Sequence, residues 1–267
     1  MFVWKEKKHQ KDELSKVMDI DSSWRGSNRR AISLVPFPYT KYCERQVAQA
    51  SKVRYQQLLI SMEGKQSTTC LKVVSPKKKS RGALLVFRGK AIGCVYGKKD
   101  LSNQLLGQEA YKYFLDDLST PDSIVDHYIL PEELALAAAA LFHGDVFRQP
   151  HNLTPRRTFE YAYAHFVETE LPGCIVIRHD DGRGVLAFIY FFAGRVVGVF
   201  TFSDGWLSDS QLQCLSILDR ESQIEVSASK LLAFNVWEVN NLAFSLTGLS
   251  EVPVTQPKVL HPIDFLI

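Results

Sequence analysis

Residues 82–97 read GALLVFRGKAIGCVYG, and a closely similar stretch, GVLAFIYFFAGRVVGVF, follows at residues 184–200. In each stretch, apolar and β-branched residues lie on both sides of a short turn that contains glycine, which is typical of a β-hairpin. An offset of 105 residues (194 − 89) places Gly89 on Gly194 and Gly93 on Gly198. The same offset matches three further pairs: Lys90 with Arg195, Phe87 with Phe192 and Ile92 with Val197. These coincidences predict an internal duplication, with the four glycines as structural hairpin residues.

The elements around the two hairpins are predicted to follow one order twice. In the first half we expect a helix over 41–64 capped by Thr40, strands at 68–75, 83–87 and 91–97, a helix over 102–118 capped by Ser102, a strand at 123–130 and a helix over 131–142. In the second half we expect a helix over 153–171 capped by Thr154, a strand at 173–179, a hairpin over 185–202, a helix over 208–222 and a strand at 223–229.

The predicted fold class is therefore α+β, with two tandem pseudo-symmetric units that each contain an antiparallel β-meander and flanking helices. We expect a mobile polar arm at 1–33, a first repeat at 34–150, a second repeat at 151–249 and an extended C-terminal tail at 250–267. The predicted strands carry apolar residues on both faces, so each sheet has an apolar face that its own unit leaves uncovered. The second copy can cover that face, as the partner does in a homodimer.

Composition narrows the classes of protein to consider. The net charge of +3 is too small to indicate an obligatory nucleic-acid partner. The first twenty residues lack the apolar run of a signal peptide or membrane helix, which favours a cytoplasmic protein without membrane insertion. The five cysteines have wide, irregular spacing, which is typical of free thiols in a reducing compartment and not of a metal or redox site.

The residues of the first hairpin also resemble a known family. Gly82, Leu84, Phe87, Gly89, Lys90 and Ile92, followed by Gly107 and Ala110, match the meander and the Gly-x-x-Ala helix start of the PATAN family over residues 55–130, with Cys94 in place of the usual alanine. The second copy keeps Gly194, Arg195 and Val197 but has LQCLSIL where the Gly-x-x-Ala would stand. The resemblance implies an adaptor domain of bacterial signalling, in a family linked to gliding, twitching and type IV pili.

Candidate contact residues lie in two places. The Lys-rich loop between the first two strands offers Lys77, Lys78, Lys79 and Arg81, and the apolar C-terminus offers Phe265, Leu266 and Ile267. A Lys-rich hairpin loop can contact phosphate groups, although it is also typical of a solvated sheet end. The apolar C-terminus is predicted either to fold back as a strap or to dock on a partner.

The sequence contains no combination of nucleophile, base and oxyanion donors that predicts an active site. The motif HDDG at 179–182 could be imagined as a metal site, but a hairpin turn explains it, so we expect no catalytic, cofactor-binding or metal-binding residues. The leading hypothesis is a non-enzymatic cytoplasmic adaptor with protein partners, possible homo-oligomers included. The alternative is a regulator that senses a small ligand or nucleotide, or a degenerate enzyme, using a cleft between the two repeats.

Overall fold

A computed structural model describes residues 43–45, 52–101, 104–146, 153–180, 184–203, 205–207, 216–219, 223–231 and 243–248. These residues form two antiparallel β-sheets and the helices that cover them, so the predicted α+β class with two sheet units is confirmed. The predicted arm at 1–33 and the tail at 250–267 lie outside the described residues.

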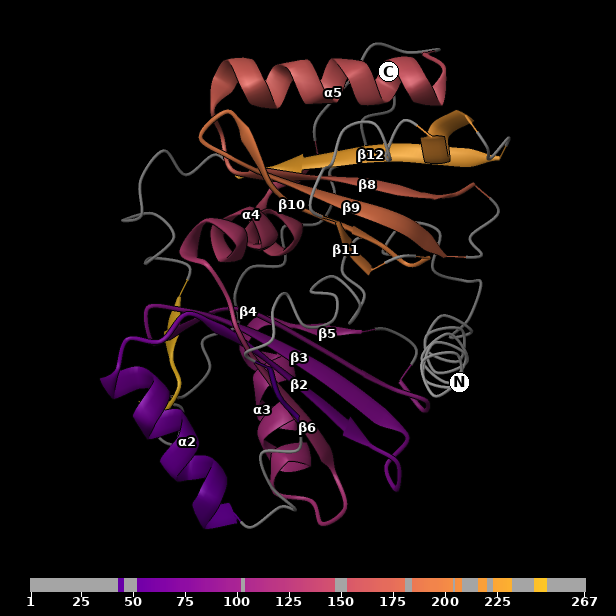
Figure 1. Cartoon of the computed structure of the whole chain (residues 1–267). Helices are drawn as coiled ribbons and strands as arrows, with labels where there is room; N and C mark the ends of the chain where they lie inside the picture. The colour runs from indigo at the N-terminus through magenta and orange to yellow at the C-terminus, as the bar shows by residue number, and fades with distance from the viewer. Residues whose placement is uncertain are drawn as a thin grey trace, which may run out of the picture.

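The first sheet is built on the predicted meander. Its strands are β1 (Cys43–Arg45), β2 (Thr69–Ser75), β3 (Ser80–Phe87), β4 (Lys90–Lys98), β5 (Leu105–Leu106), β6 (Ile124–Ile129) and β13 (Phe244–Ser245). They lie in the order β1-β6-β2-β3-β4-β13, and β5 also pairs with β4. Helices α2 (Lys52–Gly64) and α3 (Gly107–Leu118) lie on its outer face (Figure 1).

The second sheet repeats this plan. Its strands are β7 (Asp145–Val146), β8 (Gly173–His179), β9 (Val185–Phe192), β10 (Arg195–Thr201), β11 (Gly205–Leu207) and β12 (Ile224–Lys230). They lie in the order β11-β10-β9-β8-β12-β7. Helix α5 (Pro155–Thr169) covers the outer face, and its N-cap residue Thr154 accepts a hydrogen bond from the Arg157 amide, as the sequence predicts. In each unit, the strand that comes fourth along the chain, β6 or β12, therefore lies beside the first strand, β2 or β8. The second and third strands follow in space.

The two glycine hairpins have the same backbone geometry. The central turn residues have positive φ angles of 45° and 77° at Arg88 and Gly89, and of 48° and 72° at Ala193 and Gly194. Positive φ at both positions is the requirement of a type I′ turn, which matches the natural twist of paired strands. Each hairpin then has an irregular register, because Ile92 and Val197 have no partner in the ladder. Turn and bulge thus lie at matching positions, 105 residues apart (194 − 89).

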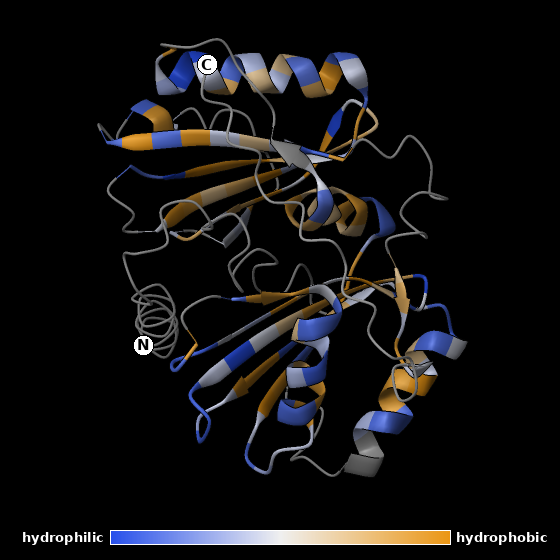
Figure 2. Cartoon of the chain, turned by 180° about the vertical axis from the view of Figure 1, so that it is seen from behind, coloured by the Kyte–Doolittle hydropathy of each residue, from blue (hydrophilic) through white to orange (hydrophobic). Residues whose placement is uncertain are grey.

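Helix α4 (Glu132–His143) lies between the two sheets. Every residue from 134 to 142 is buried, which is expected of a helix that is apolar on all sides. One core cluster contains these residues together with Leu85 and Phe87 of the first sheet and Phe188 and Tyr190 of the second. Figure 2 shows α4 as a mainly hydrophobic helix in the layer between the sheets. The free apolar faces predicted from the sequence are therefore covered through α4.

The outer faces have separate cores. Under α2 and α3, the first sheet contributes residues such as Leu71 and Leu84, which pack against Tyr111 and Phe114. Under α5, the second sheet contributes residues such as Ile175 and Phe191, which pack against Phe166. The described residues thus form five layers: outer helices, first sheet, α4, second sheet and α5 (Figure 1).

Two predicted helix starts are wrong. Residues 43–45 form strand β1 against β6, so the first helix begins at Lys52 and not near Thr40. Leu105 and Leu106 form strand β5 against β4, so α3 begins at Gly107. In both places the local helical spacing is overridden by an available sheet edge, which supplies backbone partners that sequence spacing alone does not reveal. Ser102, the predicted cap, lies outside the described residues.

Short strands also cross between the two sequence halves. β7 precedes α5 and pairs with β12 of the second sheet, whereas β13 follows the second unit and returns to β4 of the first. Residues 244–245 therefore belong to the first sheet, although they fall within the predicted second repeat. Residues 145–146 likewise belong to the second sheet, although they fall within the predicted first repeat. The expected domain boundaries remain predictions.

Overpacking of α4 tests whether the helix is a tightly packed layer. We expect Ala138→Leu to lower the free energy of unfolding by about 1–3 kcal/mol, because Ala138 is fully buried between the sheets. Chemical denaturation measures the change. The same substitution at the exposed Ala164 of α5 is the control and should change stability by about 0.5 kcal/mol or less. Equal effects at the two positions would show that α4 is loosely packed.

Candidate functional site

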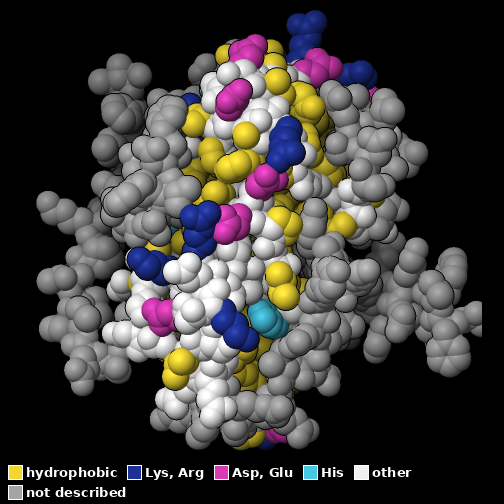
Figure 3. All heavy atoms as spheres, turned by 60° about the vertical axis from the view of Figure 1, so that its left-hand side comes forward, with side chains coloured by type: hydrophobic (Ala, Val, Ile, Leu, Met, Phe, Trp, Pro, Cys, Tyr) yellow, Lys and Arg dark blue, Asp and Glu magenta, His cyan; other side chains and the backbone are white. Residues whose placement is uncertain are grey.

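The N-terminus of α4 is bound to both hairpins by ion pairs. Arg88, in the first hairpin turn, donates to Glu132 from Nε at 2.9 Å and from Nη2 at 2.7 Å. Arg195, at the start of β10, donates to Glu133 at 2.5 Å. Consecutive glutamates of one helix turn thus contact equivalent regions of the two sheets. In Figure 3, basic and acidic side chains lie next to one another across the face that is on the left in Figure 1.

These ion pairs orient the helix more than they stabilise it. Arg88 and Glu132 have side chains 50% and 46% exposed, a setting in which an ion pair contributes roughly 1 kcal/mol or less. Hydrogen bonding from Arg88 lowers the pKa of Glu132. Because the folded-state pKa is lowered, this small contribution is present at neutral pH and is lost as the pH falls through the acidic range.

The predicted hairpin glycines provide close packing around α4 and the outer helices. A Cβ atom on Gly93 would lie 2.8 Å from the Phe142 ring, and one on Gly198 would lie 3.3 Å from Leu134, so both glycines face α4. A Cβ on Gly89 would lie 2.7 Å from the carbonyl oxygen of Glu63 in α2. A Cβ on Gly194 would lie 3.1 Å from the carbonyl oxygen of Val167 in α5. Each hairpin therefore packs between α4 and the C-terminal end of its own outer helix.

The C-terminal end of α4 is also attached to the first sheet. The imidazole Nε2 of His143 lies 2.5 Å from the carbonyl oxygen of Ile92, the bulge residue of β4. The bulge leaves Ile92 out of the β3–β4 ladder, and the histidine provides a donor for its carbonyl. Helix α4 is thus bound to the first sheet at both ends, and it occupies the space between the repeats where a ligand cleft was one of the hypotheses.

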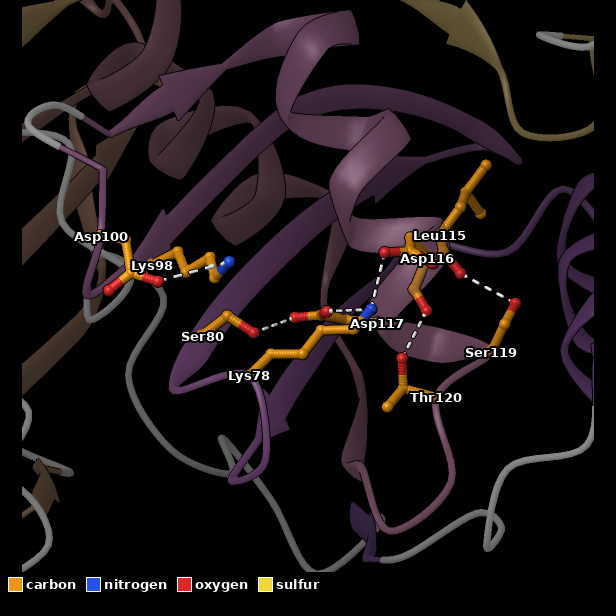
Figure 4. Close-up of polar contacts among 9 residues, drawn as sticks. All are labelled: Lys78, Ser80, Lys98, Asp100, Leu115, Asp116, Asp117, Ser119 and Thr120. Carbon is orange, nitrogen blue, oxygen red and sulfur yellow. Dashed lines mark hydrogen bonds and ion pairs between the residues drawn. The ribbon is translucent and has the colours of Figure 1, made fainter.

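The Lys-rich loop lies against the C-terminal end of α3, as Figure 4 shows. Lys77 pairs with Asp122 at 2.5 Å, and Lys78 lies 2.6 Å from Asp116 and 3.1 Å from Asp117. Lys79 has a positive φ of 52° within the turn, and Arg81 is half-buried on β3. Lys77 and Lys78 thus bind carboxylates of their own unit, which reduces the charge that this loop can offer to a phosphate group.

Asp117 is the buried centre of that contact. Its side chain is fully buried, and it accepts a hydrogen bond of 2.5 Å from Ser80 Oγ. Burial lowers the pKa of Lys78, but the hydrogen bonds with Asp116 and Asp117 outweigh this effect and raise the pKa above its normal value. Burial also raises the pKa of Tyr96, with a contribution from the Asp117 carboxylate. Because Ser80 is only 1% exposed, this set of groups holds the β2–β3 turn against α3 and gives no access to a substrate.

The described cysteines are core residues. Cys70, Cys94 and Cys174 are free and buried. Burial raises the pKa of the Cys70 thiol to about 12, so it is protonated at neutral pH and is a poor nucleophile. Cys70 and Cys174 both belong to the core cluster around α4, on the first strands of the two meanders. Their role is therefore packing.

Residues 243–248, which we call the strap, bind to the first sheet, and the sequence analysis did not predict this contact. Phe244 and Ser245 pair with Ala91 and Lys90 of β4, and Leu246 is only 2% exposed. The hydroxyl of Tyr111 donates to the carbonyl oxygen of Leu246 at 2.7 Å. A two-residue strand without a strong hydrophobic pattern gives no sequence signal for such pairing. The strap shows how this fold binds an extended segment.

Other predicted positions are placed only in part. His179 ends β8 and Asp180 begins the following turn, whereas Asp181 lies outside the described residues. Within the described part of the chain, no group of three or more metal-ligating side chains comes together. Phe265, Leu266 and Ile267 also lie outside the described residues, so their proposed contact role stays a prediction. None of the described helices is both long and apolar enough to cross a bilayer.

Searches against protein families, curated proteins and solved structures find no match to this chain. The resemblance to the PATAN family thus rests on the hairpin and helix residues alone.

Removal of the buried carboxylate tests the role of Asp117. We expect Asp117→Ala to lower the free energy of unfolding by about 1.5–3 kcal/mol, because Ser80 and Lys78 lose a charged hydrogen-bond acceptor. Thermal and urea unfolding measure the loss. Asp116→Ala is the matched control, since its side chain is 71% exposed, and it should cost about 1 kcal/mol or less. A larger cost at Asp116 would contradict the assignment.

Proposed function

We propose that this chain is a non-enzymatic adaptor, a protein-interaction module of bacterial signalling or motility regulation. The observation that carries the proposal is the burial of α4 between two sheets with the same strand order. This arrangement makes a continuous core out of both units and uses the apolar sheet faces for internal packing. The outer surfaces are left for partners.

We further propose that the two units are pseudo-symmetric copies that together stand in for an ancestral homodimer. Matched type I′ turns, matched bulges and the common strand order support this proposal. In a homodimer of single units, two equivalent sheet faces would meet across a twofold axis. Here a single helix lies between them, and consecutive acids of that helix bind the two hairpins.

The same observations disfavour the ligand-sensing alternative. The space between the sheets is occupied by α4 side chains that pack against both sheets, so a ligand would have to displace part of the core. The buried Ser80–Asp117 pair has the residue types of a catalytic site, but it is closed to substrate. The resemblance to the PATAN family adds the expectation of a signalling partner.

Partner capture combined with a ligand screen tests the adaptor proposal. We expect the immobilised full chain to retain a specific protein partner from cells of its source, because its folded surface and not a pocket is the functional part. In parallel, nucleotides and small metabolites should leave the melting temperature unchanged, since a ligand that binds only the folded state would raise it.

A variant with Leu134→Asp is the control for specific capture. It places a charge in the core between the sheets, where Leu134 is 2% exposed, and should abolish folding and partner retention together. A clear rise in melting temperature with a metabolite, without a retained partner, would favour the ligand sensor and contradict the adaptor proposal.

A further inference from the structure

The strap is joined to the first sheet by a short ladder and a carboxylate. Its strand β13 pairs with Lys90 and Ala91, the first residues of β4 after the hairpin turn. Two hydroxyl side chains bind Glu63 at the C-terminal end of α2: Ser245 Oγ lies 2.8 Å from Oε1 and Thr247 Oγ1 lies 2.5 Å from Oε2. Each carboxylate oxygen of Glu63 thus accepts from one hydroxyl, which fixes the spacing of the residues that bind there.

The same site contains a buried tyrosine whose acceptor is supplied by the strap. Tyr111 of α3 is fully buried, and its hydroxyl donates to the carbonyl oxygen of Leu246 at 2.7 Å. Leu246 is itself 2% exposed and belongs to the core cluster beneath α3. If the strap left and nothing replaced it, the Tyr111 hydroxyl would lose this acceptor and an apolar core position would open to water. The site is therefore costly to leave empty and needs an extended segment as its occupant.

The strap has few buried contacts with which to keep this place. Its strand β13 is two residues long. Ser245 is half-buried, and Thr247 and Gly248 are exposed, whereas Leu246 is buried. Hydrogen bonds at accessible positions add little net stability, because water competes for the same groups. A segment that supplies the same groups and pairs with more of β4 can therefore replace the strap.

The edge of β4 has room for such a longer pairing. The strap pairs with residues 90–91, and β5 pairs with residues 95–96 on the same strand. Among the described residues, no strand other than β3 pairs with Gly93 or Cys94, which lie between these two short segments. A longer segment in the register of the strap would reach both residues before it met β5.

The carboxylate that binds the strap is a feature of the first unit. A Cβ atom on Gly89 would meet the carbonyl oxygen of Glu63, and one on Gly194 would meet the carbonyl oxygen of Val167. Val167 of α5 therefore stands where Glu63 stands on α2, and the second unit has an apolar side chain in place of the acid. An acid beside the strand edge is thus not a general consequence of the meander fold.

We propose that the strap is an autoinhibitory segment and that an extended segment of a partner protein takes its place at the edge of β4. The partner segment has the chemical pattern of the strap: a buried apolar residue between two Ser or Thr residues. The carbonyl of the apolar residue accepts from Tyr111, and the two hydroxyls donate to Glu63. This inference rests on the proposed adaptor function and names the surface that the partner occupies.

A second copy of the chain fits less well as the donor of that segment. The strap of each copy is tethered beside its own site, and the tether gives it a high effective concentration there. An exchange of straps between two copies would form the same contacts that each copy forms alone, so it would gain none. A partner segment that also pairs with Gly93 and Cys94 gains contacts that the strap does not make.

A peptide with the sequence of residues 242–249, LAFSLTGL, is the probe for this site. In the full chain, Leu246→Ala weakens the tethered strap and should tighten binding of the labelled peptide about tenfold or more in an anisotropy titration. In amide NMR spectra of this variant, the peptide should shift the signals of Lys90 and Ala91. Saturating peptide should also raise its melting temperature toward that of the wild type.

A second strap variant avoids a cavity in the core. The double substitution Ser245→Ala and Thr247→Ala removes both donors to Glu63 and should likewise tighten peptide binding, because the tethered strap is weakened. Circular dichroism melting shows whether each variant is folded. The double variant therefore provides the test if Leu246→Ala does not fold.

Substitutions in the site test the assigned contacts in a folded strap variant. Tyr111→Phe removes the buried donor and should weaken peptide binding about fivefold or more. Tyr113→Phe on the same helix is the matched control, since Tyr113 is 44% exposed, and it should leave the dissociation constant unchanged. A peptide with its Ser and Thr replaced by Ala should bind more weakly, because Glu63 loses both donors.

Three results would overturn the proposal. Absence of saturable binding to the folded strap variants, or amide shifts elsewhere than at residues 90–94, would show that the strap is a permanent part of the fold. A wild-type dimer in light scattering that Leu246→Ala converts to a monomer would assign the exchange to a second copy. A partner captured equally by the wild type and the strap variants, and not released by excess peptide, would place the docking surface elsewhere while the adaptor function stands.

Discussion

The burial of α4 is the constraint on which the rest of the structure depends. A helix without a polar face can exist in water only when both of its sides are covered, and here one sheet covers each side. Alanine at positions 135 and 137–140 keeps the helix thin, so that both sheets approach it closely. Neither sheet alone could bury such a helix. The two units are therefore joined by one shared hydrophobic core, although the chain folds each meander from local hairpins.

The two hairpins determine how α4 is oriented between the sheets. A type I′ turn requires positive φ at two consecutive residues, and the chain places Arg88-Gly89 and Ala193-Gly194 there. The bulge that follows bends the strand and brings Gly93 against Phe142 of α4 and Gly198 against Leu134 of α4. A Cβ on Gly198 would also lie 2.8 Å from Trp206 of β11. Arg88 and Arg195 then bind Glu132 and Glu133. Apolar burial provides most of the energy, and these polar contacts select one position of the helix between the sheets.

Much of this fold is readable from the sequence because its strongest signals are local. Alternating apolar strands around glycine turns predict both meanders, and the Thr154-Pro155 start predicts α5, whose first residue is Pro155. Strand β1 could not be predicted, because residues 43–45 lie within a helical pattern and pair with β6, which is distant in sequence. β7 pairs with β12 of the second sheet and β13 pairs with β4 of the first. These pairings depend on where the sheet edges lie in space. No local propensity encodes such positions.

The candidate sites, like the fold, could be predicted from the sequence only in part. The Lys-rich loop is obvious in sequence, yet only the fold reveals that Lys78 binds Asp116 and the buried Asp117, 38 and 39 residues away. Gly89 and Gly194 lie in the two turns, whereas Gly93 and Gly198 lie in the strands that follow. The close approach of Gly93 and Gly198 to α4 depends on a helix that the sequence analysis assigned to the first unit alone. Sequence pattern identifies which residues are unusual. Tertiary contacts decide whether they are available to a partner.

The strap makes the two otherwise similar units different, and this difference has a physical cause. An exposed strand edge is a hazard in any sheet protein, because its unpaired backbone groups can bind another chain. A chain with two sheets has that hazard in both of them. The segment that follows the second unit is single, so it can cover only one of the two equivalent edges, and it covers β4. Among the described residues, β4 therefore has a covering strand beside Lys90 and Ala91, whereas no described strand lies beside β10 at residues 195–198, although the two meanders have one strand order.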